Sequence, residues 1–148
     1  MFETLISKLQ EDKYLTLETT PQHEPSMHNI VEKIKKFKID SKVDGFTCTD
    51  NPLAKLKYNS LFAALKLQQE FKKPVIATMT MRDRNKIALQ SDLLGANDFD
   101  IRAILALTGD PANMSDQPNS KGVFEANSLM LLKMIKSFNY GMDFAGRP

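Results

Sequence analysis

The segment PVIATMTMRDRNKIALQSDLLG, residues 74–95, decides the fold because it contains one complete strand–helix unit. Its apolar, partly β-branched run from Val75 to Met79 predicts a buried strand that ends in the polar residues 80–83. Apolar residues at helical spacing follow, and they predict a helix with Asp83 as its N-cap and Gly95 as its stop signal. A strand followed at once by a helix is the repeating unit of parallel α/β proteins.

Similar units lie on both sides of this segment. Apolar periodicity and turn residues predict strands over residues 14–18, 43–49 and 101–107, and helices over residues 2–9, 26–37, 59–71 and 127–138. The strand at 101–107 is nearly continuous in apolar residues, which is typical of burial on both faces. Residues 112–122 predict a loop of functional length, and residues 140–145 predict the start of a fifth strand.

Strands that alternate with helices predict parallel βαβ units joined by right-handed crossovers. Two architectures fit this pattern, an open doubly wound sheet and part of an eight-fold barrel, and periodicity does not choose between them. Both architectures place ligands at the carboxyl ends of the strands. The expected position of a functional site is therefore the same in either case.

Length and composition indicate one α/β domain with a real core, since 42% of the 148 residues are hydrophobic. The formal net charge of +2 provides no strong field for nucleic acid or an anionic membrane, so neither is expected as a partner. The single cysteine, Cys48, lies in an apolar run and predicts a packed core thiol in a reducing compartment. No apolar run is long enough to cross a bilayer and no signal peptide is recognisable, so we expect a cytoplasmic protein.

Polar residues end each predicted strand, and these strand ends should meet on one face. They are Glu18, residues 47–51, residues 78–85 and residues 108–110. A carboxylate at the end of a buried strand is costly unless it is solvated, paired or used, so Glu18 is a functional candidate. Asp50, Asn51 and Asp83 are explained equally well as ordinary turn and capping residues.

The sequence lacks the motifs of several other kinds of site. Without Gly-x-Gly-x-x-Gly after a strand, or a phosphate loop ending in Gly-Lys-Ser/Thr, the sequence argues against a Rossmann dinucleotide site and a nucleotide triphosphatase. His23 and His28 have the wrong spacing for a helical metal pair, and no metal cofactor is expected. A third reading is a small doubly wound domain in which Asp50, Asp83 and Asp110 bind a divalent cation.

The strand-end motifs, taken in order, resemble those of the methylenetetrahydrofolate reductases. The matching pieces are LETTP (17–21), TCTDNP (47–52), MTMRDRN (79–85), IALQSDLLGA (87–96), ILALTGDP (104–111) and VFEANSLMLLKMI (123–135). The resemblance implies a flavoprotein oxidoreductase of one-carbon metabolism and methionine biosynthesis, which reduces 5,10-methylenetetrahydrofolate to 5-methyltetrahydrofolate with FAD. It further implies that residues 1–148 are the first half, strands one to five, of a TIM-type (β/α)8 barrel.

The resemblance also implies roles for individual residues. Glu18 matches the acid that protonates the folate nitrogen, a role that needs a carboxyl kept protonated near neutral pH at a site shielded from water. Asp110 matches an aspartate close to the flavin ring. Cofactor-lining positions, in addition to Asp110, are Thr49, Thr78, Leu107, Thr108, Gly109 and Ala145.

Two departures from the family pattern open alternatives. Bacterial members have an arginine at the position of Thr108 and a histidine at that of Thr78, so FMN stands beside FAD as a candidate cofactor. Strands six to eight, and the folate contacts they bring, are missing. The alternative function is thus a truncated, non-catalytic half-barrel that binds flavin, or that assembles with a complementary subunit or further copies of itself. The electron donor, NAD(P)H or ferredoxin, is left open.

Overall fold

The computed structural model describes residues 1–11 and 13–148, and its elements alternate between helix and strand after a leading helix. The strands are β1 (Thr16–Thr19), β2 (Gly45–Cys48), β3 (Val75–Thr80) and β4 (Ala103–Leu107). The α-helices are α1 (Phe2–Gln10), α2 (His28–Lys36), α3 (Ser60–Phe71), α4 (Lys86–Asp98) and α5 (Ser128–Asn139). Short 3-10 turns η1 (Asp40–Lys42), η2 (Pro52–Ala54) and η3 (Ala112–Met114) lie in the connections.

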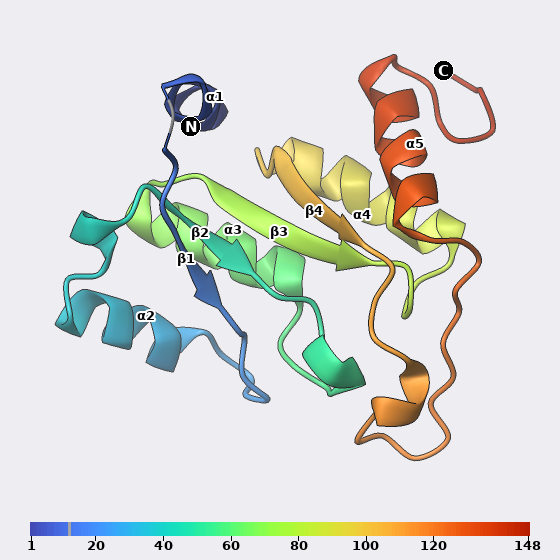
Figure 1. The fold of residues 1–148 in the computed structure, drawn as a ribbon, viewed down its shortest axis with the longest axis horizontal. Coiled ribbons are helices and arrows are strands. Elements are labelled where there is room, and N and C mark those ends of the chain that lie inside the picture. Colours follow the sequence, from blue (N-terminus) through green and yellow to red (C-terminus); the bar gives the residue numbers. More distant parts are fainter. Residues whose placement is uncertain (12) are drawn as a thin grey trace.

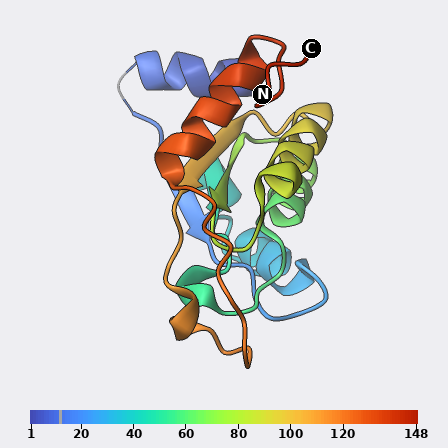
Figure 2. The same cartoon turned by 90° about the vertical axis from the view of Figure 1, so that its right-hand side faces the viewer.

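The strands form a parallel sheet in which spatial order equals chain order, β1-β2-β3-β4. Figure 1 shows α3 and α4 behind this sheet, and Figure 2 shows α2, α3 and α4 along one side of it. A doubly wound sheet would reverse its strand order and carry helices on both faces. The chain is therefore of the TIM-barrel type, as the family resemblance implies, and its four strands are half of the eight that such a barrel contains.

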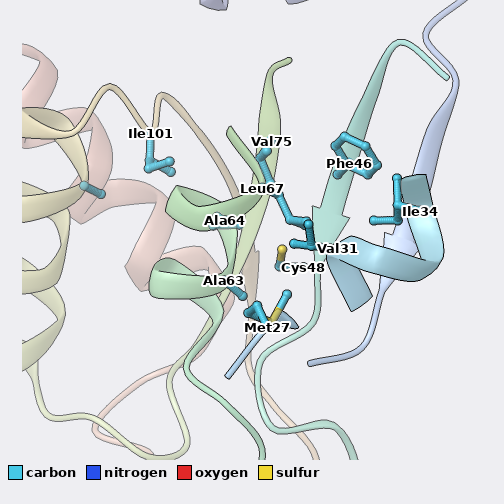
Figure 3. Close-up of a cluster of buried hydrophobic side chains, with 12 residues drawn as sticks. Met27, Val31, Ile34, Phe46, Cys48, Ala63, Ala64, Leu67, Val75 and Ile101 are labelled. Atoms are coloured by element: carbon cyan, nitrogen blue, oxygen red, sulfur yellow. The ribbon is translucent and has the colours of Figure 1, made fainter. Parts of the chain in front are cut away.

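The hydrophobic core lies between the sheet and the helices. Side chains alternate along a strand, so Phe46 and Cys48 point toward the helices together with Val75 of the neighbouring strand (Figure 3). Val31 and Ile34 of α2 pack against them from the helix side (Figure 3). A second cluster joins β3 and β4 to the following helices through Met79, Leu89, Leu131 and Met134, with Ile104 and Ala106 packed against it. Cys48 is completely buried, which confirms the prediction of a core thiol.

The opposite face of the sheet is open. The register pairs Glu18 with Thr47, Thr78 with Leu105 and Thr80 with Leu107, which places these residues on the second face. No helix in the described part of the chain covers this face, and Leu105 and Leu107 are 45% and 41% exposed. The predicted burial of residues 101–107 on both faces is therefore wrong. Ile104 and Ala106 pack against the helices, whereas Leu105 and Leu107 lie on the open face.

Two predicted helix boundaries are also wrong. The α4 helix is capped by the side chain of Asn85, which accepts a hydrogen bond from the Ala88 amide at 2.9 Å. Asp83 does not cap this helix because its carboxylate is paired with Arg82. Gly95 lies inside α4, which continues to Asp98 because Ala96, one residue further on, is buried in the core.

The predicted fifth strand is not formed, since residues 140–147 make consecutive turns. Gly141 and Gly146 have φ values of +75° and +81°, which suit turns and not an extended strand. Asp143 fixes the turn by accepting hydrogen bonds from the amides of Ala145 and Arg147 at 2.8 and 2.9 Å. The segment folds back on α4, where the Phe144 amide donates to Gln90 at 2.8 Å.

Among the described residues, no helix is long and apolar enough to span a membrane.

Candidate functional site

A hollow of about 360 Å³ lies on the open face at the carboxyl ends of the strands. This volume falls within the roughly 300–1,000 Å³ range of small-molecule sites. All four strand ends contribute to the lining, which consists of Glu18, Thr49, Asp50, Pro52, Thr78, Thr80, Arg82, Leu105, Leu107, Thr108, Gly109 and Asp110. The polar strand ends therefore converge on one face, as the sequence predicts.

Most of the residues expected to form the site line this one hollow. They are Glu18, Thr49, Thr78, Leu107, Thr108, Gly109 and Asp110. Ala145 does not line it, because it belongs to the turn that follows α5 and its amide is bound to Asp143. Arg82, Thr80 and Leu105 line the hollow although the sequence did not single them out as site residues. The sequence contained a signal for these three residues, because side chains two positions apart along a strand point to the same face. Thr80 and Arg82 follow Thr78 at this spacing, and Leu105 precedes Leu107.

Thr49 carries a polar atom without a partner. Its Oγ1 is buried and makes no hydrogen bond to any described residue. A buried polar group left unpaired costs about 1–3 kcal/mol, so such atoms are rare in folded chains. Because Thr49 lines the hollow, a small change of its side-chain rotamer would present this hydroxyl to a polar atom of a ligand.

Glu18 lies on the open face of β1 and is exposed, so the expectation of a buried strand end is wrong here. The reason is that β1 is an edge strand whose second face has no covering layer in the described chain. No hydrogen bond or ion pair among the described residues occupies the Glu18 side chain. Its carboxyl group is therefore accessible at the rim of the hollow.

Asp50 is a buried carboxylate that holds two strand ends together. It accepts hydrogen bonds from the amide and the hydroxyl of Thr80 at 2.9 and 3.1 Å, and it forms an ion pair with Arg84 at 2.8 Å. The Arg84 guanidinium also contacts Asp92 at 2.8 Å. Burial acts to lower the pKa of Arg84, but the nearby Asp50 and Asp92 outweigh it and the pKa is raised. Asp50 is thus a paired structural group and not a free ligand.

Arg82 is only 2% exposed and forms a two-pronged ion pair with its neighbour Asp83, with Nε and Nη2 each 2.7 Å from a carboxylate oxygen. Burial acts to raise the pKa of Asp83, but the Arg82 guanidinium outweighs it and the pKa is lowered.

Asp50 and Asp83 are each neutralised by an arginine. Residues 1–11 and 13–148 contain no group of three carboxylate, histidine or cysteine side chains able to hold a metal. The cation reading of the aspartates therefore gains no support.

Asp110 links two loops at the hollow. One of its carboxylate oxygens accepts a hydrogen bond from the Leu53 amide at 2.6 Å. Leu53 and Ala54 both have left-handed backbone conformations, with φ values of 56° and 55°. Gly109, beside Asp110, has a φ of +100°, and a Cβ atom there would lie 3.0 Å from the Cβ of Arg82. Glycine is therefore required at position 109 both for its backbone angle and for close packing.

A chain-ordered parallel sheet with helices on one face and a strand-end hollow on the other defines a barrel-type α/β protein whose hollow has the size of a small-molecule site. The family model for methylenetetrahydrofolate reductase matches residues 3–147. The chain belongs to the methylenetetrahydrofolate reductase family, in agreement with the sequence motifs. This membership indicates an oxidoreductase that acts on folate. A search of curated proteins found no match to the chain.

Proposed function

We propose that this chain provides the flavin-binding face of a site that reduces 5,10-methylenetetrahydrofolate to 5-methyltetrahydrofolate. Family membership supports the reaction class. The observation that carries the site assignment is the convergence of all four strand ends on one hollow, with Thr49 and its unpaired hydroxyl among the lining residues. The hollow combines the apolar side chains of Leu105 and Leu107 with polar groups from neighbouring strands. A flat ring with polar edges requires this combination of surfaces.

The residues present fit a flavin. Thr49 and Thr78 would face its polar edge and Leu107 its ring, with the Gly109 backbone beside them in the same hollow. The Thr108 hydroxyl accepts a hydrogen bond from the Ser128 amide at 3.1 Å and keeps its own proton for a further acceptor. When bound, the flavin would supply the hydride for the reduction. FAD and FMN share the ring that these residues would contact, so both belong to the proposal.

Two carboxyl groups have proposed roles in the chemistry. Glu18 would donate a proton to the folate nitrogen. It is exposed in the ligand-free chain, so the shielding from water that this role needs would have to come from the bound flavin and folate. Asp110 would place a negative charge beside the ring and the cationic substrate. A carboxylate accepts several hydrogen bonds, so Asp110 can hold Leu53 and contact a ligand at the same time.

The second candidate is a flavin-binding or partner-binding half-barrel without turnover. It is favoured by the open sheet face, on which Leu105 and Leu107 are 45% and 41% exposed. Exposed apolar surface of this kind favours association with another surface. The occupant in this case is a complementary subunit or a further copy of the chain.

Titration of the purified protein with FAD and with FMN tests the proposal. Binding is followed by flavin fluorescence, and turnover is then assayed with 5,10-methylenetetrahydrofolate and NADH, NADPH or reduced ferredoxin in turn. Flavin uptake with folate-dependent oxidation of one donor is the expected result. Uptake without turnover favours the second candidate, and the absence of uptake contradicts both flavin-based functions.

A further inference from the structure

Arg82 connects the loops that follow three of the four strands. From its position beyond β3, Nη2 donates to the Asn51 carbonyl after β2 at 3.0 Å. Nη1 donates to the Asp110 carbonyl after β4 at 3.5 Å, a longer and weaker contact. The Arg82 backbone carbonyl accepts a hydrogen bond from the Val123 amide at 2.6 Å. One residue therefore contacts the loops on both sides of its own strand.

Most N–H donors of the Arg82 guanidinium are bound to other groups of the protein. An arginine has five N–H donors. Nε is bound to Asp83, Nη2 to Asp83 and Asn51, and Nη1 to Asp110. An arginine that binds an anionic ligand needs its planar fork free, whereas this fork faces Asp83. Its geometry thus suits the holding of neighbouring loops and not the capture of a ligand.

We propose that Arg82 is a positioning residue that sets the place of Asp110 at the flavin site and of the Asn51 loop beside that site, an inference that rests on the proposed function. Its contacts lie on either side of the hydrogen bond between the Leu53 amide and the Asp110 carboxylate. Gly109 packs directly on the Arg82 side chain, since a Cβ added at Gly109 would lie 3.0 Å from that of Arg82. Loss of the guanidinium would release the β2–α3 loop and the Asp110 backbone together.

The experiment compares Arg82→Lys and Arg82→Ala with the control Arg102→Lys. Lysine keeps the charge at position 82 but cannot make the planar fork to Asp83 together with the bond to Asn51. Arg102 provides a control at an exposed arginine–aspartate pair, because it contacts Asp100 at 2.9 Å near the start of β4, away from the hollow. Dissociation constants for FAD and FMN are measured, together with hydrogen exchange of the Leu53 amide in the flavin-free protein.

We expect Arg82→Lys to weaken flavin binding by about tenfold to a hundredfold, as for the loss of a charged hydrogen bond. The Leu53 amide should exchange faster while the β3 amides stay protected, and Arg102→Lys should match the wild type. Added guanidinium, at concentrations that leave the fold intact, should restore binding to Arg82→Ala, and methylammonium should not.

Three outcomes overturn the inference: unchanged flavin affinity in Arg82→Lys, unchanged Leu53 exchange, or equal rescue by both cations. If Arg82→Ala does not fold, Arg82→Lys decides the matter alone. The exchange measurement needs no flavin, so it distinguishes failure of the positioning role from failure of the proposed function. A wild-type chain that takes up no flavin contradicts the function, whereas unchanged Leu53 exchange in Arg82→Lys contradicts the role of Arg82.

Discussion

The Asp110 carboxylate accepts a hydrogen bond from the Leu53 amide at 2.6 Å, although the two residues are 57 positions apart in the sequence. This bond joins the end of β4 to the loop after β2. Asn51, Leu53 and Ala54 in that loop all have positive φ angles, between 43° and 56°. Non-glycine residues in this region carry a conformational cost and need support from their surroundings. Asp110 therefore has a structural partner in addition to its proposed role toward the flavin.

Replacement of Asp110 separates these two roles. Asp110→Ala removes the acceptor for the Leu53 amide, so we expect the free energy of unfolding to fall by about 1 kcal/mol. Asp110→Asn keeps an acceptor oxygen without the charge, and its stability should remain near that of the wild type. Urea denaturation measures both variants, and flavin titration should show weaker binding for both. Equal stability of Asp110→Ala and Asp110→Asn would contradict the structural role.

The left-handed conformation of Leu53 predicts a stabilising substitution. Asparagine tolerates this region better than leucine, and Leu53 is 47% exposed, so little packing is lost. Leu53→Asn should raise the free energy of unfolding by about 0.5–1 kcal/mol. Leu56→Asn is the matched control, because Leu56 is 44% exposed and lies outside the left-handed region. If thermal unfolding shows no advantage of the Leu53 variant over the Leu56 variant, the assignment of strain fails.

The buried pair of Asp50 and Arg84 predicts a large loss of stability. Asp50→Asn leaves the Arg84 guanidinium without its buried counter-charge, which costs about 3–5 kcal/mol. Asp92 is the outer partner of the same arginine, and its own side chain is 34% exposed, so Asp92→Asn should cost at most about 1 kcal/mol. Chemical denaturation of the two variants gives the comparison, and similar losses would rule out a special role for Asp50.

The unpaired hydroxyl of Thr49 predicts opposite effects on stability and binding. Thr49→Val removes the unsatisfied oxygen, so the ligand-free chain should gain about 1 kcal/mol, while flavin affinity should fall. Thr47→Val is the control, because the Thr47 hydroxyl donates to Thr16 at 3.2 Å and does not line the hollow. The control should lose stability and keep its flavin affinity. Unchanged flavin binding in Thr49→Val would remove this residue from the proposed site.

Burial of Cys48 predicts a loss of stability in alkaline solution. Burial raises the pKa of this thiol from 9.0 to about 11, because the fold favours the neutral form. The contribution of the neutral Cys48 thiol to the free energy of unfolding is complete below about pH 9 and is lost as the pH rises toward 11. Burial also raises the pKa of Tyr14 to about 12, which adds a second loss at higher pH. Urea denaturation should therefore show a shallower decline from pH 9 for Cys48→Ala. Identical slopes would contradict this account.

The sequence was sufficient for those features that depend on local pattern. Apolar runs with β-branched residues identified β2 and β3, and the polar residues after them identified the edge where the hollow lies. The helices predicted from residues 59 and 127 begin at Ser60 and Ser128, each capped by the side chain of the asparagine before it. The choice between a barrel and a doubly wound sheet needed strand order, and local periodicity does not contain that information.

The missed features depend on contacts between distant residues. Asp83 and Asn85 are both able to cap α4, and the ion pair with Arg82 decided the competition in favour of Asn85. The pairing of Asp50 with Arg84 spans 34 residues and leaves no local pattern. The apolar and aromatic residues within 140–145 predict the start of a strand, but the hydrogen bonds that Asp143 accepts hold this segment in a turn.

Agreement between strand order and chain order has a consequence for synthesis on the ribosome. Each strand pairs only with the strands that precede or follow it in the sequence. Each strand–helix unit can therefore dock on the preceding unit as soon as it leaves the ribosome, before later parts of the chain are made. The groups around the hollow would then come into place from Glu18 to Asp110. The bond from Asp110 back to Leu53 would be among the last to form, and it would close a loop that until then lacks this support.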